Sequence, residues 1–194
     1  MKKINPDNRP SVEQLERELN RIKHKKTYKN TLKSTIYTLI TVAAIAILVA
    51  TLWLPVLQIY GNSMAPALQN GEILFTVKTS KFEEGDIIAF YYNNKILVKR
   101  VIAGEGDWVD LDPDGNVYVN NQLLSEPYIA DKALGDCNIE LPYQVPDGKI
   151  FVMGDHRSTS VDSRNTAVGC VGQEQIVGRI VFRVWPLNVI GAIG

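Results

Sequence analysis

Residues 96–104, Ile-Leu-Val-Lys-Arg-Val-Ile-Ala-Gly, decide the fold class of most of this 194-residue chain. The run is apolar except for two adjacent basic residues, and strand alternation puts Leu97, Lys99 and Val101 on one face. Arg100 then lies on the other face, so the two basic side chains cannot both reach water if one face packs inward. The stretch predicts a strand that buries a basic residue.

Apolar runs of similar character recur on both sides of this strand, at residues 87–92, 117–120, 150–154 and 176–185. Turns rich in Gly, Asp and Asn separate them at short intervals, and no long helical period appears among them. Residues 57–194 are therefore predicted to form a mainly β, antiparallel domain, large enough for a core of its own.

Residues 36–54 form a run of nineteen residues without a charge. As a helix the run would span roughly 28 Å, close to the hydrocarbon thickness of a bilayer. A buried core helix and a cleavable signal peptide are the alternatives, but the length of the run and the lack of a small-x-small site after it favour an uncleaved anchor. We expect a basic cytoplasmic segment at 1–34, a transmembrane signal anchor at 35–56 and an extracytoplasmic domain at 57–194.

The charge distribution supports one orientation of this anchor. The net charge is zero, yet residues 1–35 hold ten Lys and Arg against four acidic residues, while the remainder holds eleven against seventeen. Basic residues flanking a membrane segment stay on the cytoplasmic side. We therefore expect the N-terminus inside and residues 57–194 outside.

A short amphipathic helix is predicted inside the cytoplasmic segment. Ser11 and Gln14 have the spacing of a capping box. Apolar residues then follow at heptad spacing: Val12, Leu15, Leu19 and Ile22. Two heptads are too few for an independent coiled coil, so a weak self-association stripe, a membrane-surface helix and a frayed basic tail all remain open.

Several classes of function lack their usual motifs. The two histidines are His24 and His156, and no HExxH or paired CxxC motif is present, so we expect no metal and no other cofactor. The outer domain has no phosphate-binding glycine loop and no basic patch interleaved with aromatic residues, which argues against a nucleic-acid partner.

A serine and a lysine are candidates for nucleophilic catalysis. Ser63 lies in Gly-Asn-Ser-Met-Ala-Pro, residues 61–66, directly after the membrane segment. Burial of Lys99 would lower its pKa toward neutrality, and a neutral amine can take a proton from a serine hydroxyl. Taken singly, a structural loop serine and an edge lysine that reaches water are the commoner interpretations.

The polar segment 153–164, Met-Gly-Asp-His-Arg-Ser-Thr-Ser-Val-Asp-Ser-Arg, follows an apolar run directly. Asp162 and Arg164 could form an ion pair, and a hydroxyl in the segment could orient a neutral lysine. A solvated charged loop is the ordinary alternative.

Together these segments resemble the type I signal peptidase family. The shared blocks follow the anchor in order: Ser-Met-Ala-Pro at 63–66, Gly-Asp-Ile-Ile at 85–88, Lys-Arg-Val-Ile-Ala-Gly-Glu-Gly-Asp at 99–107, and Gly-Asp-His-Arg-Ser-Thr-Ser-Val-Asp-Ser-Arg at 154–164. The resemblance covers about residues 57–186. It implies a bacterial membrane-bound serine endopeptidase with the family's antiparallel β-sheet domain.

The resemblance also implies roles for single residues. Ser63 would be the nucleophile and Lys99 the general base. The site-support positions would be Ser160, which orients the lysine amine, Asp155, Asp162 and Arg164. The backbone N–H of Ser63 would be one oxyanion donor. Gly61 stands where some members have a serine that supplies the second donor, and His156 stands where Asn is commoner, which creates a rival base.

The same resemblance implies the substrate. Family members cut after small residues at the first and third positions before the scissile bond. The matching pocket positions are Ile59, Met64, Leu68 and Val98. The substrate would lie extended against a strand edge. Signal peptides of preproteins and the bilayer are the expected partners, with the secretion translocon as a further candidate.

Three questions remain open at this stage. Cys137 and Cys170 could form a disulfide on the outer side or be two buried thiols. A self-cleaving Ser–Lys protease of the repressor type is a rival, which the anchor argues against. A catalytically silent homologue that acts as a membrane-anchored binding module is the alternative function.

Overall fold

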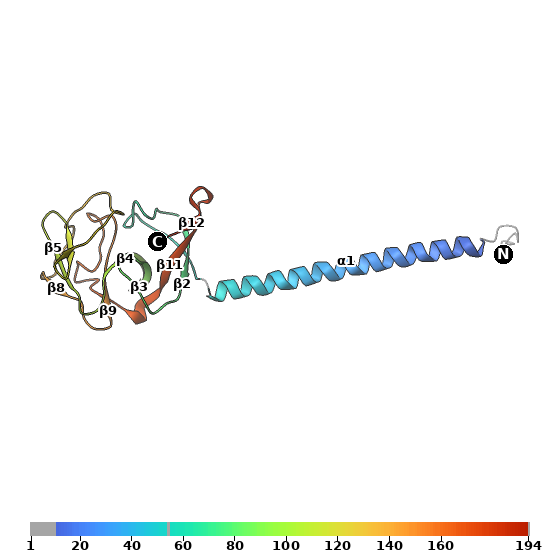
Figure 1. Cartoon of the computed structure of the whole chain (residues 1–194), viewed down its shortest axis with the longest axis horizontal. Helices are drawn as coiled ribbons and strands as arrows, with labels where there is room; N and C mark the ends of the chain where they lie inside the picture. Colours follow the sequence, from blue (N-terminus) through green and yellow to red (C-terminus); the bar gives the residue numbers. More distant parts are fainter. Residues whose placement is uncertain (1–10, 54, 194) are drawn as a thin grey trace. The chain divides into compact units, whose positions relative to one another are not determined.

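The computed structural model describes residues 11–53 and 55–193, and its N-terminal part is one α-helix, α1, Val12–Trp53 (Figure 1). The predicted capping box at the start of the helix is present. The backbone N–H of Gln14 donates to Ser11 Oγ at 3.3 Å, and the backbone N–H of Ser11 donates to Gln14 Oε1 at 3.0 Å. These bonds satisfy amide groups that the first helical turn leaves without partners.

The separate short cytoplasmic helix that we expected is not present. Its residues and the apolar run belong to the same continuous helix, because no Gly or Pro interrupts the chain between Val12 and Trp53. Within the described residues, one helix is long and apolar enough to cross a membrane, and it is this one. The side chains of Val12, Leu15, Leu19 and Ile22 are exposed.

The larger of two sheets has eight strands, and the predicted antiparallel fold is confirmed. Its strands lie in the order β1-β2-β11-β3-β4-β9-β10, and β12 pairs with β11. Neighbouring strands are antiparallel throughout. The strands are β1 (Val56–Gln58), β2 (Ile73–Val77), β3 (Ile87–Tyr92), β4 (Lys95–Ala103), β9 (Lys149–Met153), β10 (Val171–Gly172), β11 (Ile176–Trp185) and β12 (Gly191–Ala192).

The smaller sheet has four strands in the order β7-β6-β5-β8. They are β5 (Trp108–Leu111), β6 (Val117–Val119), β7 (Gln122–Leu123) and β8 (Tyr143–Gln144). Two 3₁₀ turns, Gln173–Gln175 and Leu187–Val189, complete the regular structure of the described domain.

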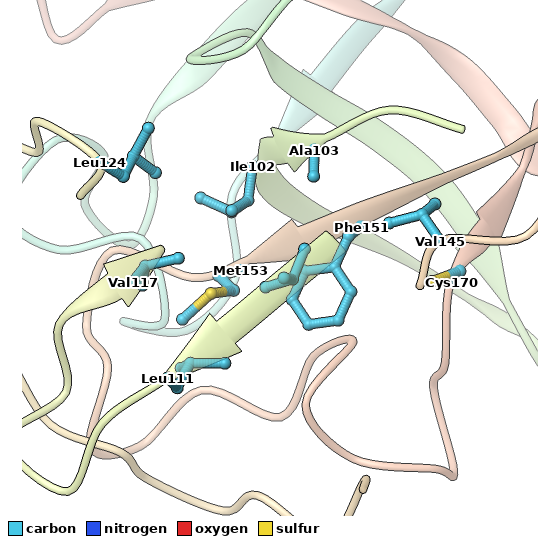
Figure 2. Packing of buried hydrophobic residues seen from close by; sticks show 10 residues of the cluster. Ile102, Ala103, Leu111, Val117, Leu124, Val145, Phe151, Met153 and Cys170 are labelled. Atoms are coloured by element: carbon cyan, nitrogen blue, oxygen red, sulfur yellow. The ribbon is translucent and has the colours of Figure 1, made fainter. Parts of the chain in front are cut away.

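One cluster of buried side chains joins the two sheets. Phe151 and Met153 on β9 and Ile102 on β4 pack with residues of the small sheet, among them Leu111 and Val117 (Figure 2). Phe151 and Met153 are fully buried. The packing fixes the end of β9, and the polar segment 154–164 begins where β9 ends.

The predicted strand at residues 96–104 is β4, and its pairing leaves one edge free near Lys99. β4 pairs with β3 along its length, with Lys99 opposite Ile88. It pairs with β9 only from Arg100 onward. Among the described strands, none covers residues 95–99 on the β9 side. This open edge has backbone groups available for an extended chain.

Of the two alternatives left open for Cys137 and Cys170, the structure has free thiols and no disulfide. Cys170 belongs to the core cluster that joins the sheets, whereas Cys137 is only half-buried on an irregular segment. Burial raises the pKa of the Cys170 thiol to about 11, which keeps it protonated and unreactive.

Candidate active site

The structure brings Ser63 and Lys99 together, although 36 positions separate them in sequence. Lys99 Nζ lies 2.8 Å from Ser63 Oγ. Ser63 is half-buried on the loop between β1 and β2, and Lys99 on β4 is 2% exposed. A nucleophile and a base within hydrogen-bond reach are the minimum arrangement for nucleophilic catalysis.

Burial gives Lys99 the electrostatics that a general base needs. The pKa of Lys99 is lowered from 10.5 to about 8, mainly by desolvation and also by the nearby charge of Arg164, while Asp162 and Asp155 oppose the shift. A neutral amine is therefore much more accessible near neutral pH than it is for a lysine in water.

The polar segment after β9, residues 154–164, forms a loop that packs against the Ser63 loop. We call it the catalytic loop. The backbone N–H of His156 donates to the Ser63 carbonyl at 3.0 Å. A Cβ added to Gly154 would collide with both Ser160 Oγ and the Ser63 carbonyl oxygen. Only glycine allows this close approach of the two loops.

Ser160 lies in this contact zone, but it makes no hydrogen bond to the lysine amine. Its hydroxyl is buried and has no partner of ordinary hydrogen-bond geometry within the described residues. It lies near enough to Asp162 to help lower the pKa of that carboxyl. An unpartnered buried hydroxyl beside Ser63 and Lys99 is available for a further hydrogen bond.

The ion pair anticipated between Asp162 and Arg164 is present and fully buried. Arg164 Nε donates to Asp162 Oδ1 at 2.8 Å, and Nη2 donates to Oδ2 at 2.9 Å. Burial alone would raise the pKa of Asp162, but Arg164 and other hydrogen-bond donors outweigh it and lower the pKa. Asp162 Oδ2 also accepts the Gly154 N–H at 2.9 Å, which ties the pair to the catalytic loop.

Sequence reasoning missed the partner of Asp155. Arg100 donates to Asp155 from Nε at 2.9 Å and from Nη2 at 2.7 Å. The sequence did contain a signal for this partner. Arg100 lies on the face of β4 opposite to Lys99, and a second basic residue on a buried strand needs an anion of its own. Arg100 is 5% exposed, so this bidentate pair is also buried.

A groove of about 710 Å³ runs beside Ser63. Three of the four predicted pocket residues line it: Ile59, Met64 and Val98. Leu68 does not, because it is completely buried beneath them in the cluster that includes Ile59 and Met64. A second cavity of about 320 Å³ adjoins Ser63 and Lys99. A larger cavity of about 770 Å³ is lined by neither residue.

The rival base His156 and the two backbone amides at Gly61 and Ser63 differ in their hydrogen-bond partners. His156 Nδ1 lies 3.0 Å from Thr159 Oγ1, within its own loop. The Gly61 N–H donates to Asn70 Oδ1 at 2.9 Å, so this amide is already engaged. The N–H of Ser63 donates to no acceptor among the described residues, which leaves it available to an oxyanion.

Comparisons with known proteins agree on one family. Residues 32–185 match the model of the family described as signal peptidase, peptidase S26. A signal peptidase I of Bacillus licheniformis is 34% identical over 178 residues, which cover 84% of this chain and 93% of the relative. Signal peptidase I S of Bacillus subtilis is 39% identical over 140 residues, covering 66% and 75%.

A solved structure of a signal peptidase I from Enterococcus faecalis is also similar. It has 32% identity and a TM-score of 0.42, and the match covers 51% of this chain and 96% of the solved chain.

Proposed function

Because the chain belongs to the signal peptidase family, peptidase S26, we propose that Ser63 and Lys99 are the nucleophile and general base with which it works. The protein is a membrane-bound protease that removes signal peptides. The main support for these two roles is the 2.8 Å distance between Ser63 Oγ and Nζ of Lys99, a lysine that is almost completely buried.

The reaction begins with the neutral amine of Lys99, which takes the proton of Ser63 Oγ as that oxygen attacks the scissile carbonyl. The tetrahedral oxyanion accepts a hydrogen bond from the Ser63 N–H. The Lys99 ammonium then returns its proton to the leaving amine, and the C–N bond breaks to give an acyl-enzyme. A water, deprotonated by Lys99, hydrolyses the ester and frees Ser63.

The groove beside Ser63 supports a preference for small side chains at the first and third positions before the cut. Ile59, Met64 and Val98 line it, and the first two are buried to more than 90%. An extended signal peptide can add to the free edge of β4 at residues 95–99, which turns alternate side chains toward these apolar residues. Packing around Ile59 and Met64 holds this floor in place, so we expect it to yield little to a large side chain.

The test uses the full chain in detergent micelles and a preprotein that carries an Ala-x-Ala site. We expect a single cut after the second alanine, located by mass spectrometry of both products. A matched substrate with Phe in place of that alanine should be left intact. Cutting of both substrates at the same rate would contradict the pocket assignment, and no cutting of either would contradict the proposed function.

The pH dependence of the reaction is a further prediction. The Lys99 amine is protonated below its pKa of about 8 and neutral above it. We therefore expect kcat/KM to rise with pH through about 8 and then to level off. Initial rates on the Ala-x-Ala substrate across this range check the expectation. A rate that does not change with pH around 8 would contradict a base with the pKa of Lys99.

Orientation in the membrane is a separate proposal. The basic residues before the apolar run favour a cytoplasmic N-terminus and an external domain from residue 57 onward. External protease added to intact spheroplasts should then leave only a small N-terminal fragment in the membrane. Full protection of the chain would reverse the assigned orientation.

A further inference from the structure

The irregular segment 126–135 contacts every arginine that supports the catalytic loop. We call it the bracing segment, and it lies between β7 and β8, two strands of the smaller sheet. The three arginines are Arg100, Arg157 and Arg164, each buried to at least 95%. Such cations are stable in a protein interior only where anions or carbonyl oxygens face them.

Glu126 pairs with Arg157, and both side chains are fully buried. Arg157 Nη1 donates to Glu126 Oε2 at 3.1 Å, and Nη2 donates to Oε1. From the same guanidinium, Nε donates to the Gly154 carbonyl at 3.2 Å. Arg157 thus links the bracing segment to the glycine that contacts Ser160 and the Ser63 backbone.

Tyr128 makes the second contact. The guanidinium carbon of Arg100 lies 3.9 Å from the centre of the Tyr128 ring, within the range of a cation–π interaction. The same guanidinium forms the bidentate pair with Asp155. The Tyr128 hydroxyl also donates to Glu126 Oε1 at 3.0 Å, so the two contacts are joined.

The third contact uses backbone carbonyls. Arg164 Nη1 donates to the carbonyl oxygens of Leu134 at 2.6 Å and Ala133 at 3.3 Å. A Cβ at Gly135 would collide with the Arg157 carbonyl oxygen and with Arg164 Nη1. The end of the bracing segment therefore lies directly against the arginine that holds Asp162.

We propose that Glu126 and Tyr128 are positioning residues for the catalytic loop, and that the bracing segment sets how tightly this loop closes over Ser63 and Lys99. The inference rests on the proposed roles of Ser63 and Lys99. Neither Glu126 nor Tyr128 lines the two cavities that adjoin Ser63. Tyr128 lines only the cavity of about 770 Å³, which neither Ser63 nor Lys99 lines. Both residues therefore act on Ser63 and Lys99 through Arg157 and Arg100.

Because the two residues lie outside the groove beside Ser63, we expect their substitution to change kcat and to leave KM almost unchanged. A slight displacement of a catalytic group can reduce a rate by up to about 10²-fold while the substrate still binds. Glu126→Gln keeps the size of the side chain but leaves the Arg157 charge without its anion. We expect kcat to fall by about 10- to 100-fold, with KM almost unchanged.

The matched variants separate positioning from general loss of folding. Tyr128→Phe keeps the ring over Arg100 and should retain most of the wild-type kcat. Tyr128→Leu removes the ring, so its kcat should fall as in Glu126→Gln. Glu140→Gln removes the same charge from an exposed glutamate and should behave as wild type. If Glu126→Gln does not fold, the Tyr128 pair still decides between the outcomes.

A readout independent of turnover completes the test. A looser loop admits water to Lys99, so the desolvation that lowers its pKa weakens. NMR titration of the full chain in micelles, with labelled lysine, should show a higher Lys99 pKa in Glu126→Gln and Tyr128→Leu than in wild type. If wild type does not cut the substrate, the proposed function is contradicted, while the Lys99 pKa comparison still tests the positioning role. A Lys99 pKa unchanged in both variants, or a rise in KM with kcat unchanged, would overturn the positioning role.

Discussion

Replacement of Lys99 by arginine is expected to lower kcat/KM by at least about 10²–10⁴-fold, the usual contribution of a general base. Arginine is also a long basic side chain, but its guanidinium stays protonated at any working pH. It cannot accept the proton of Ser63, although it could still donate a hydrogen bond to that oxygen. Ser63→Ala should be equally inactive, because it removes the nucleophile itself.

His156→Asn is the control for this prediction. The backbone N–H of His156, which donates to the Ser63 carbonyl, is retained in the variant, and the lost side chain contacts Thr159 within the same loop. Most of the activity should therefore remain. All variants are compared on one Ala-x-Ala substrate, with folding checked by circular dichroism. An active Lys99→Arg together with an inactive His156→Asn would identify a Ser–His enzyme.

The fold class could be predicted because its signals are local. Alternation along residues 96–102 predicts the strand β4 and places Lys99 and Arg100 on its opposite faces. The β-domain appeared in the spacing of apolar runs and turns. The resemblance then added what local patterns cannot, namely that Ser63 and Lys99 meet across 36 positions.

What escaped prediction depends on long-range contacts or on continuity along the chain. The ion pair of Glu126 and Arg157 joins an irregular segment to the catalytic loop. The sequence around neither residue has a pattern that predicts this pair. Leu68 was expected to line the substrate pocket, but it is completely buried in the cluster with Ile59 and Met64 and does not reach the groove. The prediction of a separate short N-terminal helix was wrong, because no helix-breaking residue separates it from the apolar run.

Asp162→Asn is expected to be among the most destabilising isosteric changes in the domain. Asp162 and Arg164 have no exposed side-chain surface, so the substitution leaves a buried guanidinium without its anion. Removing one partner of such a pair typically costs about 3–5 kcal/mol in the free energy of unfolding. The loss should also reduce activity, because Asp162 holds the Gly154 amide beside Ser160 and the Ser63 backbone.

Asp86→Asn provides the matched comparison, since Asp86 pairs with Arg179 in a setting where the arginine side chain is 41% exposed. Water can solvate this arginine when the anion is lost, so the cost should stay below about 1 kcal/mol. Unfolding of both variants by urea is followed in micelles through tryptophan fluorescence, with wild type in parallel. Equal losses in the two variants would mean that the Asp162–Arg164 pair contributes no more than a surface ion pair. A large loss confined to Asp162→Asn would show that its burial makes the carboxylate indispensable to the loop that carries Ser160.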